Sequence, residues 1–128
     1  MDSQSISGSA RVVKYNDLRV WQEAMDLVTD IYRVTRRFPA EEKFGLASQM
    51  QGAAVAVPSN IAEGQGRKST PAYTNHLSIA YGSLMELETQ IQIALRLAYA
   101  GEDDVTQLIA KTNHVGKMLS ALKNSLNK

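Results

Sequence analysis

Apolar residues recur at alternating intervals of three and four positions through most of this chain, in four stretches separated by short connections that contain proline or glycine. That interval places the apolar side chains on one face of an α-helix, whose period is 3.6 residues. No stretch shows the period of two that marks a half-buried β-strand. Because short connections make consecutive helices lie side by side, the pattern predicts an all-α fold, an antiparallel up-down-up-down four-helix bundle.

The first predicted helix begins at Asp17, which can serve as its N-cap, and ends near Arg37, before the sequence Phe38-Pro39. Its expected bundle seam consists of residues at three-and-four spacing: Leu18, Trp21, Met25, Val28, Tyr32 and Thr35. Beside that seam runs a second apolar stripe, made of Val20, Ala24, Leu27, Ile31 and Val34. The two stripes together span an arc of roughly 160 degrees, which is broader than one seam requires.

The breadth of this apolar arc predicts contact with another molecule. On the third helix, Ile79, Ile93 and Leu97 likewise lie beside the main seam. Exposed apolar surface usually marks a partner surface. Identical copies are always available as partners, so we expect self-association. The alternative is a monomer with an unusually wide core.

Helices two and three are connected by a turn that is rich in glycine. The second helix is expected to start after Glu41-Glu42 and to end at Gly64, with Pro58 bending or breaking it. The third is expected to start at Thr70-Pro71 and to stop at Gly101.

A fourth helix is expected to start at Asp103 or Asp104 and to run toward the C-terminus. With 128 residues, the chain is long enough for one domain with its own core, which we expect to span residues 15–128. Residues 1–14 are rich in serine and glycine, and we expect them to form a flexible N-terminal arm.

Composition excludes several classes of protein. The absence of cysteine excludes disulfides, thiol catalysis and cysteine-ligated zinc. No apolar run approaches the length of a membrane span, and the N-terminus lacks the pattern of a secretory signal, so we expect a cytoplasmic protein with no membrane contact. The formal net charge is only +1, so any affinity for nucleic acid must come from local clusters of lysine and arginine.

Four polar residues interrupt the apolar faces of helices two and three. Asn60 and Glu63 are three positions apart, as are Ser83 and Glu86, so each pair shares a helix face. Burying such groups is costly unless they are paired, so we predict that the four form a buried polar network that sets the helix register. The alternative is a general acid or base whose pKa is changed by burial. No nucleophile or cofactor motif accompanies them, which favours a structural role and a non-enzymatic protein.

The sequence predicts neither a metal centre nor a bound cofactor. A di-iron site in a helical bundle requires a glutamate three positions before a histidine on two helices. Tyr73 and Lys111 occupy those positions before His76 and His114. Two histidines without cysteine also give little support to a zinc site.

Arg67 and Lys68 lie in the glycine-rich connection between helices two and three. The spacing of the glycines is not that of a phosphate-binding P-loop, and no strand precedes them. Two cations on a turn with free backbone N–H groups can nevertheless bind a phosphate, and a solvated loop is the alternative. A second group of candidate nucleic-acid contacts lies near the end of the first helix: Arg33, Arg36 and Arg37.

Five segments together resemble the bacterial four-helix-bundle proteins named for the intervening sequences of 23S ribosomal RNA. They are YNDLRVW (15–21), FP with EKFGL (within 38–46), PSNIAEG (58–64), GRKS (66–69) and IAYGSLMELET (79–89). The resemblance covers nearly everything from Tyr15 onward. It implies a bundle that assembles as a ring, with a homopentamer the known form. It extends to the accessory protein of diversity-generating retroelements, whose basic ring binds nucleic acid and a reverse transcriptase.

The chain departs from this family at Gln51-Gly52, where two arginines are usual. Each lost phosphate contact lowers both the affinity for nucleic acid and its dependence on salt. Even so, the first hypothesis is a non-enzymatic scaffold that forms a ring and binds structured RNA, both by resemblance, with contacts through Arg67 and Lys68 and, behind them, Arg33, Arg36 and Arg37. The alternative is an adaptor that docks another protein and has no nucleic-acid role. An enzyme that uses Glu63 and Glu86 is a third hypothesis.

Overall fold

The structure is a computed structural model, and it describes residues 14–127. Its elements are the 3-10 turn η1 (Tyr15–Asp17), α1 (Arg19–Thr35), the 3-10 turn η2 (Ala40–Glu42), α2 (Leu46–Gln65), α3 (Thr70–Arg96) and α4 (Glu102–Leu126). The described residues contain no β-strand, so the prediction of an all-α fold with four helices is confirmed. Apart from Lys14, the N-terminal arm predicted for residues 1–14 lies outside the described residues.

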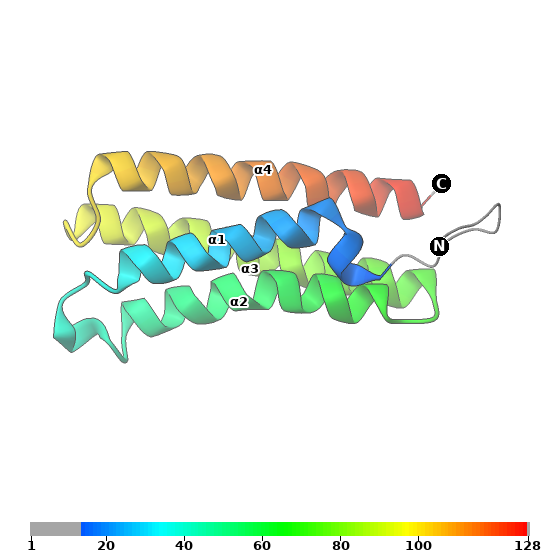
Figure 1. Cartoon of the computed structure of the whole chain (residues 1–128), viewed down its shortest axis with the longest axis horizontal. Helices are drawn as coiled ribbons and strands as arrows, with labels where there is room; N and C mark the ends of the chain where they lie inside the picture. Colours follow the sequence, from blue (N-terminus) through cyan, green and yellow to red (C-terminus); the bar gives the residue numbers. More distant parts are fainter. Residues whose placement is uncertain (1–13, 128) are drawn as a thin grey trace, which may run out of the picture.

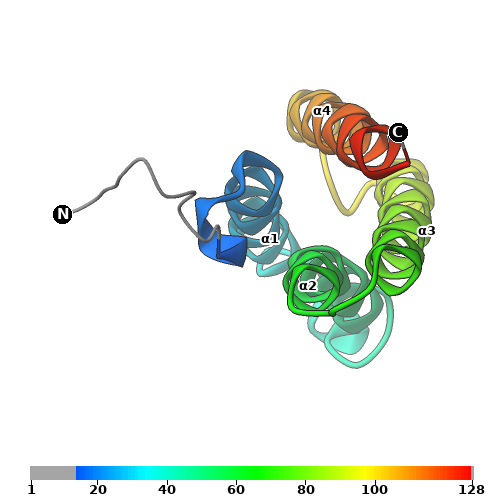
Figure 2. The ribbon, with the colours of Figure 1, turned by 90° about the vertical axis from the view of Figure 1, so that its right-hand side faces the viewer.

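The four helices share one long axis (Figure 1). Figure 1 shows α1 leading away from the end of the molecule where η1 lies, α2 returning to it, α3 leading away again and α4 returning. Seen end-on, the helices follow one another around the bundle in sequence order (Figure 2). The contact between α2 and α3 is the most extensive, and that between α1 and α4 is the smallest of the four contacts between neighbouring helices. Because α2 runs the length of the bundle, the α1–α2 connection and the α2–α3 turn lie at opposite ends of it.

The core takes one face from each helix, and on α1 this face differs from the predicted one. The buried apolar residues of α1 are Val20, Ala24, Leu27, Ile31 and Val34. Trp21 and Val28 are only partly buried, while Met25 and Tyr32 keep 40% and 39% of their surface exposed. The prediction that Met25 and Tyr32 face the core is therefore wrong, whereas Trp21 and Val28 pack against the edge of the core. A buried Trp or Tyr needs a partner for its polar group, whereas the aliphatic stripe packs against its neighbours without that cost.

The start of α2 also differs from the prediction. The backbone N–H of Leu46 donates a hydrogen bond to Glu42 Oε1 at 2.9 Å, so the helix begins four residues after the glutamate. Gly45 lets the carboxylate come this close, because a Cβ at that position would lie 2.6 Å from the same oxygen. Pro58 does not break the helix, which continues to Gln65.

The end of α3 is formed by an alanine, whereas Gly101 was predicted to stop the helix. Ala98 has a φ of +60°, in the left-handed region. Its N–H donates to the carbonyl of Leu95 at 3.0 Å, and the N–H of Tyr99 donates to the carbonyl of Ala94 at 2.9 Å. These two bonds define a Schellman motif, in which glycine is the usual residue. Gly101 is instead extended and precedes α4.

We expect Ala98→Gly to raise the free energy of unfolding by about 0.5–1 kcal/mol, because glycine adopts a positive φ without the clash of a Cβ atom. Urea denaturation measures this difference. Ala110→Gly is the matched control, since Ala110 is exposed in the interior of α4. It should lower the free energy of unfolding by about 1 kcal/mol. A similar loss from both substitutions would contradict the strained end of α3.

Candidate nucleic-acid interface

The α2–α3 turn carries the two cations that the sequence singled out as phosphate contacts. Arg67 and Lys68 are both exposed. The backbone N–H of Arg67 donates to the carbonyl of Gly64 at 3.0 Å. The Ser69 side chain caps α3 by accepting the N–H of Ala72 at 3.2 Å. Both cations thus extend from a short connection whose flanks are held by hydrogen bonds.

A chain of hydrogen bonds leads from this turn into the α2–α3 contact. Arg67 Nε donates to His76 Nε2 at 3.3 Å. On the other side of the ring, His76 Nδ1 lies 3.0 Å from Asn60 Oδ1. Asn60 Nδ2 in turn donates to the carbonyl of Ala56 at 2.9 Å. Glu63 Oε1 is 3.7 Å from His76 Nδ1.

The four polar residues predicted to form a buried network do not do so. Glu63 and Glu86 are exposed, and Asn60 and Ser83 are partly buried. Asn60 is instead bonded to His76 of α3, a residue that was not among the four. His76 precedes Ser83 by seven residues and therefore shares its helix face. That spacing was the one signal that could have identified His76.

Gly64 makes the contact between α2 and α3 unusually close at this point. A Cβ atom at Gly64 would lie 2.8 Å from the Cβ of His76 and 3.1 Å from Cδ1 of Tyr73. Burial in the same region raises the pKa of the Tyr73 hydroxyl. The imidazole of His76 therefore lies beside this close approach of the two helices, with 13% of its side-chain surface exposed.

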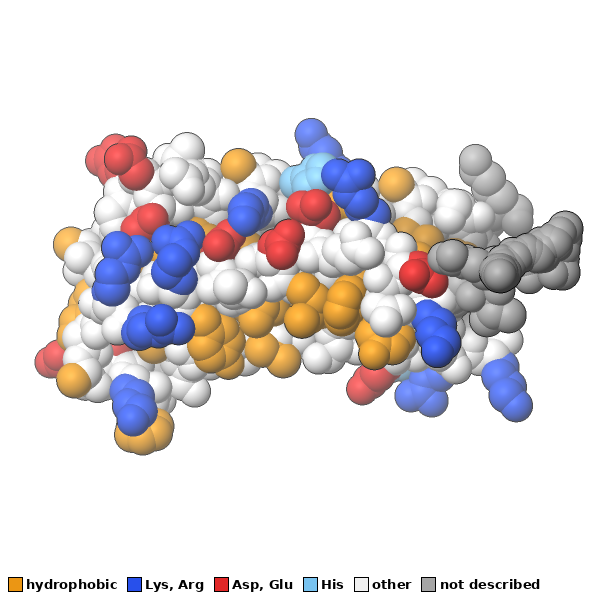
Figure 3. Space-filling view, in the orientation of Figure 1, with side chains coloured by type: hydrophobic (Ala, Val, Ile, Leu, Met, Phe, Trp, Pro, Cys, Tyr) orange, Lys and Arg blue, Asp and Glu red, His pale blue; other side chains and the backbone are white. Residues whose placement is uncertain are grey.

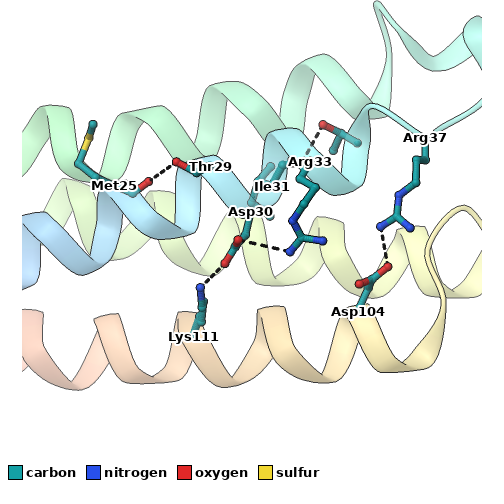
Figure 4. Close-up of polar contacts among 9 residues, drawn as sticks. Met25, Thr29, Asp30, Ile31, Arg33, Arg37, Asp104 and Lys111 are labelled. Atoms are coloured by element: carbon teal, nitrogen blue, oxygen red, sulfur yellow. Dashed lines mark hydrogen bonds and ion pairs between the residues drawn. The ribbon is translucent and has the colours of Figure 1, made fainter.

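The second group of predicted contacts, Arg33, Arg36 and Arg37, lies at the opposite end of the bundle (Figure 1). Arg33 Nη2 is 3.3 Å from Asp30 Oδ1, and Arg37 Nη2 is 2.7 Å from Asp104 Oδ2. Figure 4 shows Arg33 and Lys111 converging on Asp30, and Arg37 reaching toward Asp104 of α4. Within one chain the two basic groups are therefore far from each other. In the second group, Arg33 and Arg37 are paired with carboxylates.

An apolar groove of about 340 Å³ lies between α1 and α2 on the outside of the bundle. Eight residues line this outer α1–α2 groove: Tyr15, Trp21, Met25, Val28, Val55, Pro58, Ser59 and Ala62. Figure 3 shows an orange band of apolar side chains along α1 and α2, beside a band of red and blue charged side chains along α1 and α4. Glu63 is the one charged residue among the twenty of α2. This face is therefore suited to contact with protein.

Two residues of α2 occupy the positions where the resemblance led us to expect arginines. Gln51 Nε2 donates to Thr35 Oγ1 at 3.0 Å, so this side chain turns toward α1. Gly52 is exposed, and a Cβ atom there would meet nothing within 4 Å. Neither residue is a cation, so this part of α2 offers no positively charged side chain to a phosphate.

Glu42 links the two connections at the end of the bundle opposite the α2–α3 turn. The N–H of Leu46 and the hydroxyl of Tyr99 both donate to its carboxylate, the latter at 2.9 Å. The backbone bond from Leu46, followed by the bond from Tyr99, lowers the pKa of Glu42 below its usual 4.5. The bond to Glu42 correspondingly raises the pKa of Tyr99. The Tyr99 ring also packs against Phe38, with 5.4 Å between ring centroids.

Stability should therefore depend on the protonation of Glu42. Because its folded-state pKa is lowered, its contribution is present above pH 4.5 and is lost as the pH falls through the folded-state value. We expect Glu42→Gln to flatten the loss of stability below pH 4.5, as measured by urea denaturation at a series of pH values. Tyr99→Phe should keep most of the effect, since the bond from Leu46 is the larger cause. If the stability of Glu42→Gln falls below pH 4.5 as steeply as that of the wild type, other carboxylates cause the loss.

Within residues 14–127, no group of three or more His, Asp or Glu side chains is placed to hold a metal ion. No helix in the same range is both long and apolar enough to cross a bilayer.

Comparison with known proteins adds a family and a fold. A family model described as 23S rRNA-intervening sequence protein matches residues 16–121. The crystal structure of a protein of unknown function, from the S23 ribosomal protein family of Bacteroides thetaiotaomicron, is similar, with a TM-score of 0.76 and 17% sequence identity. The match covers 81% of this chain and 97% of that chain. At this identity the likeness concerns the fold. No curated protein matches the chain.

Proposed function

This chain belongs to the family of 23S rRNA-intervening sequence proteins, and within that family we propose that it is a non-enzymatic helical scaffold, one that assembles as a ring and binds structured RNA, by preference ribosomal. The proposed RNA contacts are first Arg67 and Lys68. The observation that carries this proposal is the different state of the cations at the two ends of the bundle.

Cations that are already paired with carboxylates contribute little to phosphate binding, because the pair must be broken first. Arg33 and Arg37 are paired in this way, and Arg36 extends from the same end. Neither Arg67 nor Lys68 makes an ion pair with a carboxylate in the part of the chain that the structure describes. Of the two predicted groups, Arg67 and Lys68 are therefore the cations that bind a phosphate without first breaking an ion pair with a carboxylate, and the three arginines, two of which are paired, form a secondary group.

A single copy offers few phosphate contacts, and assembly would multiply them. In a cyclic ring whose axis is parallel to the bundles, the same end of every copy lies on the same side. A homopentamer would then place five Arg67-Lys68 pairs on one rim. Affinity for nucleic acid rises with the number of phosphates neutralised. We propose that the relation to the accessory protein of diversity-generating retroelements has this physical basis, a ring that concentrates basic turns.

Two apolar faces support the proposed ring. One is the outer α1–α2 groove, and the other consists of the exposed residues Ile79 and Ile93 of α3 with Leu97 at its C-cap. The first face belongs to α1 and α2 and the second to α3, so one is not a repeat of the other. Contact between two different faces of identical copies is heterologous, and a heterologous contact closes into a ring when its rotation permits.

We expect Met25→Glu to weaken assembly at least about tenfold, which corresponds to roughly 1.4 kcal/mol. Met25 lines the outer α1–α2 groove, where a buried carboxylate would have no cationic partner from α2. Sedimentation equilibrium or light scattering gives the molar mass. Gln107→Glu is the control, because it adds the same charge at an exposed position on α4. A wild-type protein that stays monomeric at micromolar concentration would contradict the ring.

RNA binding is tested by fluorescence anisotropy with labelled 23S ribosomal RNA fragments over a salt series. The logarithm of the affinity should fall linearly with the logarithm of the salt concentration, with a slope of roughly −1.5 for each copy that contributes both cations. Duplex DNA is the competitor, and we expect RNA to be preferred. If the nuclease-treated protein binds no RNA at low salt, the nucleic-acid function is wrong.

A second candidate function is that of a protein-interaction adaptor with no nucleic-acid role. The observation that favours it is Phe44, which keeps 89% of its surface exposed. Lys43 Nζ lies 5.6 Å from the centroid of its ring. Phe44 borders a groove of about 570 Å³ between the end of α1 and the start of α2. An exposed aromatic ring beside a groove is typical of a surface that docks another protein.

A further inference from the structure

We infer that His76 is a positioning residue that holds the guanidinium of Arg67 for a phosphodiester group. The inference rests on the proposed function, since it explains how Arg67 would bind RNA. It is carried by the bonds that lead from Arg67 through His76 and Asn60 to the backbone of α2.

The hydrogen bonds determine which ring nitrogen of His76 carries the proton. The Nε–H of an arginine can only donate, so His76 Nε2 must accept and is unprotonated. The neutral imidazole then carries its proton on Nδ1 and donates it to Asn60 Oδ1. The orientation of Asn60 agrees, because its Nδ2 faces the carbonyl of Ala56, which can only accept. Each of the three hydrogen bonds therefore joins one donor to one acceptor.

The position of His76 is itself fixed by packing. The ring extends from α3 over Gly64 of α2, where no side chain intervenes between the helices. Asn60 holds its inner nitrogen, and the outer nitrogen is directed at the α2–α3 turn. The charged groups that face the ring are Glu63 of α2 and Arg67 of the turn.

The bond to His76 leaves the terminal nitrogens of the Arg67 guanidinium available for a phosphate. Only Nε is bonded to His76, so the two terminal nitrogens of the guanidinium remain available. These two nitrogens form the fork that binds a phosphate through two parallel hydrogen bonds. Immobilising a long side chain upon binding usually lowers affinity by a factor of about two to ten. A side chain that is already held avoids most of that loss.

Two substitutions of His76 separate the positioning role from a merely structural one. His76→Asn keeps an amide N–H near the position of Nδ1, and so keeps the bond to Asn60, but places no acceptor near the position of Nε2, where Arg67 donates. His76→Gln places an amide oxygen near the position of Nε2 and keeps that acceptor. We expect His76→Asn to weaken RNA binding about three- to tenfold and His76→Gln to retain most of it. In an Arg67→Ala background, both substitutions should be without effect on binding.

The tautomer provides a readout that does not require RNA. Nitrogen-15 NMR of the free protein should show His76 protonated at Nδ1 and unprotonated at Nε2, with His114 as the internal comparison. A His76 that is protonated at Nε2 overturns the inference. So does a His76→Asn variant that binds RNA as the wild type does while Arg67→Ala binds it weakly, a result that leaves the proposed function standing. A wild-type protein that binds no RNA overturns both.

Discussion

Replacing Arg67 and Lys68 together by glutamate is expected to weaken binding of structured RNA at least about a hundredfold at low salt, or roughly 2.7 kcal/mol. Each substitution removes a phosphate contact and adds a repelling charge at the same place. In a ring the substitutions are repeated in every copy, so the charge of the Arg67-Lys68 rim changes from positive to negative. Anisotropy titrations of a labelled ribosomal RNA fragment measure the loss, and the salt slope should become shallower as well.

The matched control makes the same change of charge at the opposite end of the bundle. Arg33→Glu with Arg37→Glu reverses two cations that Asp30 and Asp104 already neutralise. Exposed ion pairs of this kind contribute at most about 1 kcal/mol to stability, so the fold should persist. We expect RNA affinity to change less than about threefold. Equal losses in the two double variants would point to a diffuse field without a local site. If the Arg67 and Lys68 variant binds RNA normally, the adaptor hypothesis replaces the RNA hypothesis.

Gly64→Ala is expected to lower the free energy of unfolding by about 2–3 kcal/mol, although alanine is the better helix former. The added Cβ atom would lie 2.8 Å from the Cβ of His76 and 3.2 Å from the carbonyl oxygen of Tyr73. Neither is the free end of a flexible side chain, so one helix must move away from the other. The α2–α3 contact is the most extensive in the bundle, and its separation disturbs packing along both helices.

Gly52→Ala is the matched control for this prediction. Gly52 lies in the same helix, is exposed, and has nothing within 4 Å of an added Cβ atom. Its replacement should therefore raise the free energy of unfolding by about 1 kcal/mol through helix propensity alone. Urea denaturation of the two variants gives opposite signs if the close approach at Gly64 is real. A stabilised Gly64→Ala variant would show that α2 and α3 are farther apart.

Helix number and the positions of the connections were predictable because they depend on local chemistry. The three-and-four spacing of apolar residues identified all four helices, and Pro71 correctly marked the first turn of α3. The acidic residues of the α4 N-terminus, Asp103 and Asp104, likewise placed its start within two residues. The family that the sequence motifs resemble is the family whose model matches residues 16–121.

The core face of α1 could not be predicted from spacing. Two adjacent stripes are apolar, and both obey the same period, so periodicity favours neither. The structure buries the aliphatic stripe that contains Leu27 and Ile31 and leaves Met25 and Tyr32 partly exposed. The choice depends on the shape of the surfaces that α2 and α4 present to α1, and this information is distributed over three helices.

In the candidate site, too, local features followed from the sequence, whereas contacts between helices did not. The sequence alone determined that Arg67 and Lys68 lie on an exposed turn, because glycine and serine around them end one helix and begin the next. It did not determine that His76 bonds Arg67, that Asn60 bonds His76 instead of joining Ser83, or that Arg33 and Arg37 are neutralised at the other end. Helix formation depends on residues within a few positions of one another. Partners across helices depend on the closeness of α2 and α3 at Gly64 and on the rotation of each helix, which only the packed bundle decides.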